Sequence, residues 1–383
     1  MIYLDHASAS SPIPDFVIGA VTRHLKEITG SELRSSSSGN LLDTCRTALS
    51  SFLGLNEDHN LIFTKNATEA FNLYFFGFDK KIANIFIDSY SHNAVIRPAH
   101  EISLTTETVV HVLSRKDNFI KNIKESLKKS HKTNDCSILC VNAASNVTGE
   151  VLTNEDFNVL FHLTREHENL HVFFDFSQFT GNFKLPQIPE DVNYYVAAAA
   201  SAHKYLLAPE SLGFLFFHKN IKIKPLLFGG TGFDSELKEM PNDYPYKLEA
   251  GTYPMTSLCG LNASIEKGYS FFNEIYERKL NLGRYFFEEM QELKTFQVYG
   301  VKPESNKHSL VFSIAHQSLD SSEIAFILYE NYQIITREGF HCSPLTFSEL
   351  PEIFHNGSLR ISLGWNTSQG DIENLLSAMK DLN

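Results

Sequence analysis

A lysine near the middle of the chain follows a run of small apolar residues. Lys204 ends the stretch Ser201-Ala202-His203-Lys204, which comes directly after the alanines at 197–200. An ammonium group in such surroundings loses hydration, so its pKa falls and the free amine becomes a nucleophile toward aldehydes. We therefore expect Lys204 to form a Schiff base, although taken alone the same residues also fit a surface lysine beside a turn.

Polar residues also follow two other apolar runs. Asp175 comes directly after residues 171–174, with Gln178 shortly beyond it, and Asn146 follows the run at 138–141. Apolar strands that alternate with helices predict a parallel sheet covered on both faces. Ligands bind at the carboxyl ends of such strands, so we expect Asp175, Asn146 and Lys204 to meet there.

A further expected strand is followed directly by an expected helix. The apolar residues 61–63 precede Asn66-Ala67-Thr68-Glu69-Ala70, and the polar residues of this segment are typical of a helix start. The free amides and positive dipole end of such a helix bind phosphate well. A capped helix without a ligand is the plainer alternative.

Together these residues suit one cofactor. Pyridoxal phosphate (PLP) needs a lysine for its aldehyde, an acid beside its pyridine nitrogen, a planar group over its ring and donors for its phosphate. Asp175 is a candidate for the pyridinium, His92 for stacking on the ring and Gln178 for the phenolic oxygen. The candidates for the phosphate are Thr68, Ser201 and His203.

Composition narrows the class of protein. The chain has 383 residues, 43% of them apolar and 20% charged, as in ordinary globular proteins, and this length fits a large domain with a smaller one. A formal net charge of -12 argues against nucleic acid or an anionic membrane surface as the main partner. We see neither a secretory signal nor a membrane-spanning segment in the sequence, and we expect a cytoplasmic protein.

Metal and disulfide chemistry are not expected. The five cysteines are an odd and scattered set, which fits neither a disulfide framework nor paired zinc knuckles. None of the sixteen histidines falls into a spacing such as H-E-x-x-H.

Short segments along almost the whole chain resemble the class V aminotransferase group of fold-type I PLP enzymes, and within it cysteine desulfurases and selenocysteine lyases. They occur in the same order as in that family. The matching segments are Tyr3-Leu4-Asp5, Asn66-Ala67-Thr68-Glu69-Ala70, Ser91-His92-Asn93-Ala94-Val95, Ala144-Ser145-Asn146-Val147-Thr148-Gly149-Glu150, Asp175 with Gln178, Ser201-x-His203-Lys204, Gly229-Gly230-Thr231-Gly232, Glu249-Ala250-Gly251-Thr252, Arg337-x-Gly339-x-His341-Cys342 and Leu359-Arg360. Each segment alone is a weak signal, whereas the full set in order is specific.

The resemblance implies an α/β fold of fold type I. We expect a large domain with a mostly parallel seven-stranded sheet between layers of helices, and a small α/β domain at the C-terminus. The expected boundaries are 1–15 for an N-terminal arm that packs with the small domain, 16–255 for the PLP-binding domain and 256–383 for the small domain.

The resemblance also implies a role for each site residue. Lys204 would form the Schiff base, Asp175 would pair with the pyridine nitrogen, and His92 would stack on the ring and carry protons. The other residues implied at the cofactor are Ala67, Thr68, Asn146, Gln178, Ser201 and His203. Thr252 would reach the phosphate of a neighbouring subunit, which implies a homodimer with shared active sites. Arg360, with Asn146 and Arg337, would bind the substrate, since a guanidinium suits a carboxylate.

Cys342 separates the functional alternatives. A desulfurase needs a thiolate that takes sulfur from L-cysteine as a persulfide and leaves L-alanine, and we expect Arg337 and His341 to favour that thiolate. The segment Arg-x-Gly-x-His-Cys resembles the desulfurases with a short, constrained loop. A sulfur-acceptor protein is then a possible partner, beside the small amino-acid substrate. If Cys342 is an inert buried cysteine, the alternatives are an aminotransferase, a selenocysteine lyase, a carbon-sulfur β-lyase or an epimerase.

The chain departs from the family pattern near the expected substrate entrance and subunit contact. His6 and Ser8 replace the usual asparagine and alanine, Ala208 and Ser211 replace glycines, and Tyr253-Pro254 replaces Pro-Asn. These changes leave the expected cofactor residues intact. A scaffold protein without turnover is the alternative from outside enzymology, and it would be expected to lose Lys204 or Asp175 first.

Overall fold

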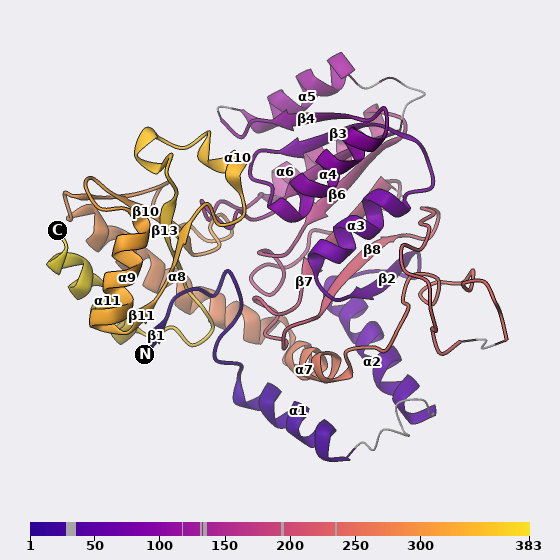
Figure 1. The fold of residues 1–383 in the computed structure, drawn as a ribbon, viewed down its shortest axis with the longest axis horizontal. Helices are drawn as coiled ribbons and strands as arrows, with labels where there is room; N and C mark the ends of the chain where they lie inside the picture. The colour runs from indigo at the N-terminus through magenta and orange to yellow at the C-terminus, as the bar shows by residue number, and fades with distance from the viewer. Residues whose placement is uncertain (28–35, 117, 131, 133–135, 193–194, 234–235) are drawn as a thin grey trace.

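The computed structural model describes residues 1–383 except 28–35, 117, 131, 133–135, 193–194 and 234–235. Two sheets organise the fold, and Figure 1 shows the larger one beside the smaller one, with helices around both. The strand β1 (Ile2–Tyr3) lies beside β11 (Ile334–Ile335), so the N-terminus is placed among C-terminal elements.

The larger sheet has seven strands in the order β2-β8-β7-β6-β5-β3-β4. From β7 to β4 all neighbouring strands are parallel, and β8 alone runs antiparallel to both of its neighbours. The mostly parallel sheet expected from the sequence is therefore confirmed. Its strands are β2 (His59–Thr64), β3 (Ile82–Asp88), β4 (Val109–Leu113), β5 (Cys136–Asn142), β6 (Leu170–Asp175), β7 (Val196–Ser201) and β8 (Gly213–His218).

Both faces of this sheet are covered. Alternate residues of one strand belong to different cores: Phe173 packs with α3 and α4, whereas Phe174 packs with α6 on the other face. The strands β5 to β8 are buried along their whole length, which is why they lack a polar face. The helices of this part are α1 (Asp15–Glu27), α2 (Ser36–Leu53), α3 (Ala67–Gly77), α4 (Asn93–Thr105), α5 (Phe119–Ser130) and α6 (Asn154–Glu166).

The smaller sheet is antiparallel and has the strand order β12-β13-β10-β9. Its strands are β9 (Phe296–Val298), β10 (Val311–His316), β12 (Arg337–Gly339) and β13 (Ser358–Ser362). The helices around it are α8 (Gly268–Gln291), α9 (Ser321–Tyr332), α10 (Pro344–Phe347), the 3-10 turn Glu352–Phe354 and α11 (Gln369–Asp381).

The chain from residue 255 to residue 291 forms two helices rather than one. α7 (Met255–Ile265) ends before Gly268, whose φ of 72° lies in the left-handed region, and α8 then begins. Glycine adopts this conformation at little cost, so the chain changes direction here while its apolar period continues.

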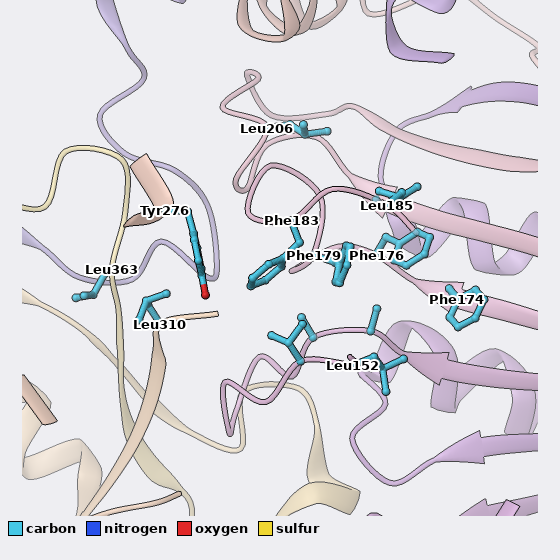
Figure 2. Packing of buried hydrophobic residues seen from close by; sticks show 14 of the residues in the cluster. Leu152, Phe174, Phe176, Phe179, Phe183, Leu185, Leu206, Tyr276, Leu310 and Leu363 are labelled. Atoms are coloured by element: carbon cyan, nitrogen blue, oxygen red, sulfur yellow. The ribbon is translucent and has the colours of Figure 1, made fainter. Parts of the chain in front are cut away.

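One aromatic series joins the two parts (Figure 2). Phe176, Phe179 and Phe183 follow β6. The ring centroids of Phe176 and Phe179 lie 5.3 Å apart, and those of Phe179 and Phe183 lie 5.1 Å apart. Phe183 then meets Tyr276 of α8 edge to face at 4.9 Å. Because these buried rings form one cluster, the two sheets share a continuous core.

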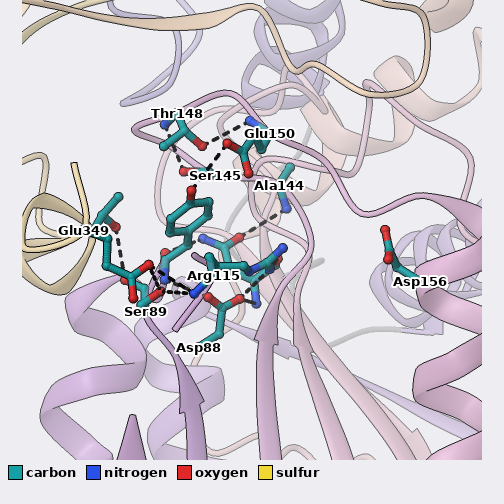
Figure 3. A network of polar contacts seen from close by, with 12 residues as sticks. Asp88, Ser89, Arg115, Ala144, Ser145, Thr148, Glu150, Asp156 and Glu349 are labelled. Atoms are coloured by element: carbon teal, nitrogen blue, oxygen red, sulfur yellow. Dashed lines mark hydrogen bonds and ion pairs between the residues drawn. The ribbon is translucent and has the colours of Figure 1, made fainter. Parts of the chain in front are cut away.

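A polar network lies at the carboxyl ends of β3 and β5 (Figure 3). The Arg115 guanidinium is paired with the buried Asp88 carboxylate at 2.5 Å and also donates to the Asn142 carbonyl. The Ser89 hydroxyl donates to Glu349, which comes from the chain after α10. The network therefore fixes the segment around α10 against the larger sheet.

Candidate active site

A pocket opens at the carboxyl ends of the central strands. It receives side chains from the ends of β5, β6 and β7 and from the starts of α3 and α4. This is the edge at which a parallel sheet with alternating helices collects its ligands. Its lining residues are Ala67, Thr68, His92, Ala94, Asn142, Asn146, Asp175, Ser177, Gln178, Ser201 and Lys204.

Lys204 lies in the turn that follows β7. The Ser10 hydroxyl and the Leu207 amide both donate to its carbonyl, at 2.6 and 3.0 Å, so its backbone is held on two sides. Burial lowers the pKa of the Lys204 ammonium to about 8, although the Asp175 carboxylate opposes this shift. Loss of hydration outweighs the attraction of the acid, which leaves an appreciable fraction of free amine near neutral pH.

Asp175 ends β6 and faces the same pocket. The Ser177 amide donates to its Oδ1 at 2.9 Å, and the residue is only 7% exposed. Burial raises the pKa of the Asp175 carboxyl, while Lys204 and the bonds from Ser177 lower it. A buried acid of this kind gains from a cationic partner, such as a protonated ring nitrogen.

The start of α3 forms the end of the pocket that suits an anion. Asn66 caps this helix by accepting a hydrogen bond from the Glu69 amide, and the Ala67 amide donates to Ser201 Oγ at 3.3 Å. Gly213 of the adjacent β8 allows this approach, because a Cβ there would lie 2.5 Å from the Asn66 carbonyl carbon. Thr68 lines the pocket at the same helix start.

His92 caps α4 and lines the pocket from that side. Its Nδ1 accepts a hydrogen bond from the Ala94 amide at 3.0 Å, so the neutral ring carries its proton on Nε2. Burial, followed by the charge of Lys204, lowers the pKa of His92 to about 3. The ring is therefore neutral at physiological pH and able to accept a proton.

Gln178 and Asn146 line the pocket from the connections that follow β6 and β5. Gln178 Nε2 donates to the Ala7 carbonyl at 2.9 Å, while its buried Oε1 has no protein partner among the described residues. Asn146 Nδ2 donates to the His341 carbonyl at 2.8 Å, and its Oδ1 accepts from Ser343. The side chain of Asn146 thus contacts the segment that carries Cys342.

Arg360 is a buried arginine on β13, 2% exposed, with several partners in the N-terminal segment. It donates to Asp5 Oδ1 at 2.5 Å, to Ser8 Oγ at 2.8 Å and to the Asn146 carbonyl at 3.3 Å. Ser8 also accepts from Arg337 Nη1 at 2.7 Å, so one hydroxyl joins both guanidinium groups. Neither arginine lines the lysine pocket directly, although their charges act on Lys204.

Cys342 lies in a second hollow, which shares Thr68, His92 and Ala94 with the lysine pocket. The thiol is partly exposed, and Arg337 Nη2 is 3.6 Å from its sulfur. His341 does not add a positive charge here, contrary to the sequence expectation. Its ring bonds to Ser358 at 2.9 Å, and burial lowers its pKa well below the ordinary range.

Two expected cofactor residues lie outside the pocket lining. His203 neighbours Lys204, and burial lowers its pKa to about 4, while its buried Nδ1 has no partner among the described residues. Thr252 is exposed to solvent and does not line the lysine pocket of its own chain. Across the described part of the chain, no group of three or more His, Cys, Asp or Glu is arranged to hold a metal ion.

The sequence reading did not single out several residues of the site. Asn142, Ser177 and Ala94 line the pocket, and the position of Asn142 directly after an apolar strand was the signal available for it. Asp5 belongs to a matching segment, but its pairing with Arg360 spans 355 positions and leaves no local pattern.

The residues present fit PLP. A lysine with a lowered pKa and a buried acid with a raised pKa face one pocket, which also contains a helix start and a neutral imidazole. The unpartnered Gln178 Oε1 and His203 Nδ1 are buried polar atoms beside it, and such atoms commonly have a ligand or water partner.

Comparison with known proteins gives full-length matches. A "Probable cysteine desulfurase" of Haemophilus influenzae is 26% identical over 390 residues, covering 99% of this chain and 85% of that protein. "Cysteine desulfurase IscS" of Dictyoglomus turgidum is 25% identical, covering 99% of this chain and 93% of that protein.

Solved structures share the fold. The apo cysteine desulfurase of Thermococcus onnurineus superimposes with a TM-score of 0.84 at 20% identity, covering 100% of this chain and 94% of that one. The cysteine desulfurase CsdA of Escherichia coli gives a TM-score of 0.80 at 20% identity, covering 99% of this chain and 94% of that one. The expected α/β fold of fold type I is thereby confirmed.

The family model for aminotransferase class-V matches residues 2–375, which is nearly the whole chain. The resemblance drawn from the sequence segments is therefore confirmed, and the protein belongs to the class V aminotransferase family.

Proposed function

We propose that the protein is a PLP-dependent cysteine desulfurase, which converts L-cysteine to L-alanine and receives the sulfur on Cys342. The observation that carries this proposal is the junction of two hollows, one with Lys204 and Asp175 and the other with Cys342, through Thr68 and His92. Class V aminotransferases are PLP enzymes, and the full-length relatives are named cysteine desulfurases.

The cofactor would be held by the residues of the lysine pocket. When bound, PLP supplies an electron sink that weakens bonds at the substrate Cα and Cβ. The free amine of Lys204 would attach it covalently, and Asp175 would keep its ring nitrogen protonated. Ser201, Thr68, His203 and the amides at the start of α3 would hold the phosphate, with Thr252 of a second copy.

The protein side chains would then act on the amino acid. The charges of Arg360 and Arg337 favour its carboxylate, and the neutral imidazole of His92 would accept and return a proton. The Cys342 thiolate would form an S–S bond to the substrate sulfur as the Cβ–S bond breaks. The electron pair of that bond stays with the carbon fragment, which is protonated to alanine, and Cys342 is left as a persulfide.

A different amino-acid substrate is the second candidate. Asp5, Ser8 and the Asn146 carbonyl already engage the Arg360 guanidinium, so less of it is free for a carboxylate. Because cysteine and the alternative substrates all carry an α-carboxylate, this arrangement does not select cysteine over another amino acid, and the reactive thiol of Cys342 has to make that distinction.

The assembly, its partners and its division into domains are parts of the same proposal. We propose a homodimer, because the segment before Thr252 exposes several large apolar side chains: Leu226, Leu227, Phe228, Phe233 and Leu237. An acceptor thiol, on a small molecule or a protein, must then remove the persulfide sulfur. The proposed setting is cytoplasmic.

The boundaries 1–15, 16–255 and 256–383 remain our proposal for the arm and the two domains. Among the described residues, no helix has the length and apolar character needed to cross a bilayer.

The decisive experiment is a product assay on the purified protein with cysteine, with and without a reductant that releases persulfide sulfur. We expect alanine and sulfide in equal amounts, and we expect the Cys342→Ala variant to lose at least about 100-fold in rate, as for removal of a nucleophile. Cys259→Ala is the matched control, since Cys259 is equally half-buried but lines a different hollow.

Two results would contradict the proposal. A keto acid or an inverted stereocentre as the product would point to the second candidate. A Cys342→Ala variant that binds the cofactor and still forms alanine at the parent rate would exclude the persulfide route.

A further inference from the structure

The thiol of Cys342 lies on a backbone turn that is unfavourable for its residue types. His341 has a φ of 49° and Cys342 a φ of 58°, so two consecutive residues with side chains are left-handed. Such conformations persist when surrounding contacts enforce them, and they gather at functional sites. Contacts from outside the turn must therefore hold it in this conformation.

Three hydrogen bonds hold the turn from the side of the larger sheet. Asn146 Nδ2 donates to the His341 carbonyl at 2.8 Å, and the Asn93 amide donates to the Cys342 carbonyl at 2.6 Å. The hydroxyl of Ser343, which is fully buried, donates to Asn146 Oδ1 at 2.9 Å. Each of the three residues at the turn is thus fixed by a group outside it.

The Asn146 amide is the centre of this arrangement. The His341 carbonyl can only accept, so Nδ2 must face it and Oδ1 must face Ser343. The His341 carbonyl therefore fixes the orientation of the amide, because an inverted amide would set two oxygens against each other. The Ser343 hydroxyl adds a second hydrogen bond, which restrains the amide in this orientation. Arg360 Nη1 donates to the Asn146 backbone carbonyl and anchors the same residue from a third side.

We propose that Asn146 and Ser343 form a clamp that positions the Cys342 thiol at the edge of the lysine pocket. This inference rests on the proposed function for its role in sulfur transfer. Asn146 lines the pocket and contacts both neighbours of the thiol, so a single amide relates the position of the substrate to that of the nucleophile. Ser343 is a positioning residue, which acts through Asn146 and does not touch the substrate.

The test is Ser343→Ala in the full-length protein, with Ser348→Ala as its matched control. Ser348 lies just after α10, is exposed, and donates its hydroxyl to the Leu345 carbonyl at 2.7 Å. The first readout needs no substrate: the rate at which iodoacetamide modifies Cys342, followed by mass spectrometry of the peptides. The rate at Cys259, the other half-buried cysteine among the described residues, is the internal reference.

We expect Ser343→Ala to speed modification of Cys342 about fivefold to tenfold, the effect of losing one hydrogen bond. Ser348→Ala should leave the rate unchanged, and neither variant should alter Cys259. In the alanine assay, kcat of Ser343→Ala should fall about tenfold with a smaller rise in KM, because the thiol is misplaced while Arg360 and Arg337 still bind the substrate.

Hydrogen exchange of the wild-type protein gives a second test that needs no variant. The Ser343 amide bonds to the Phe340 carbonyl at 2.8 Å, so peptides that cover 340–346 should exchange more slowly than the exposed segment 304–307. Equal exchange in the two segments, or equal modification of Cys342 in Ser343→Ala and Ser348→Ala, would overturn the clamp. If cysteine gives no alanine but the modification rates still differ, the clamp is supported and the proposed function is rejected.

Discussion

Lys204 and Asp175 show how one environment shifts two residues in opposite directions. Burial lowers the pKa of the lysine to about 8 and raises the pKa of the acid, because each loses hydration in its charged form. Each charge also stabilises the other, which limits both shifts. Groups with opposed shifts in one pocket are typical of acid and base roles in catalysis.

The first prediction concerns the pH dependence of PLP capture by the cofactor-free protein. Only the free amine reacts, so the rate should rise with pH and level off above about 8, where Lys204 has lost its proton. Absorbance of the bound chromophore measures the rate. Lys204→Ala should abolish the signal, and Lys238→Ala, at an exposed lysine, should leave it unchanged. A rate that still climbs steeply near the ordinary lysine pKa of 10.5 would show that burial does not act on this amine.

Single residues at strand ends were predictable from sequence, but their long-range partners were not. Asp175 and Lys204 follow apolar runs, and the structure places both in one pocket. The bond of Arg360 to Asp5 joins residues from the two ends of the chain, and no periodicity or composition indicates it. The lowered pKa of His341 likewise depends on burial and on the nearby charges of Arg360 and Arg337, which come together only after folding.

At the level of elements, two backbone turns are packed directly against each other behind the site. Gly181 follows β6 and has a φ of 85°, and a Cβ on it would lie 2.2 Å from the Tyr205 carbonyl oxygen. Tyr205 follows Lys204 directly. The position of the lysine therefore depends on the absence of a side chain at residue 181.

The second prediction is that Gly181→Ala lowers the free energy of unfolding by about 2–3 kcal/mol, because the added methyl displaces backbone and strains φ. The variant should also lose cofactor more readily on dialysis. Gly19→Ala in α1 is the control, since nothing lies within 4 Å of the added methyl and a helix interior favours alanine by about 0.5–1 kcal/mol. Urea unfolding measures both, and equal stabilities for the two variants would show that the contact at Tyr205 has no energetic importance.

The same elements show what sequence patterns reveal about architecture. The strands β5 to β8 were recognisable because burial on both faces makes them continuously apolar. The break between α7 and α8 has no comparable signal in the apolar pattern, and in the structure it is marked by Gly268, whose φ is 72°. Neither pattern contains the strand order, because the order depends on pairing between segments far apart in the sequence.

Considered as a whole, the molecule is two sheets joined by a continuous core, and a buried lysine lies where they meet. Lys279 of α8 is 1% exposed, and it donates to Asn182 Oδ1 at 2.5 Å. Its ammonium nitrogen also lies 4.4 Å from the ring centroid of Tyr205. Asn182 and Tyr205 follow strands of the larger sheet, so Lys279 connects the smaller part to the turn that carries Lys204.

The last prediction follows from the charge of this lysine. Burial, with a smaller contribution from Arg278, lowers the pKa of Lys279 to about 7 from 10.5. Between these values the unfolded chain binds more protons than the folded one, so Lys279 makes the free energy of unfolding rise with pH in that range. Below about 7 both states hold the proton, and the cost of burying the charge is constant.

Lys279→Met removes this cost, so it should stabilise the protein by about 1–2 kcal/mol at pH 6, after loss of the bond to Asn182, and progressively less toward pH 9. Urea unfolding of the variant and the parent at pH 6 and pH 9 measures the difference in their free energy of unfolding. Groups that titrate in the same way in both proteins do not contribute to this difference. A difference that does not change with pH would mean that packing at this junction, and not the buried charge, controls how firmly the two parts are joined.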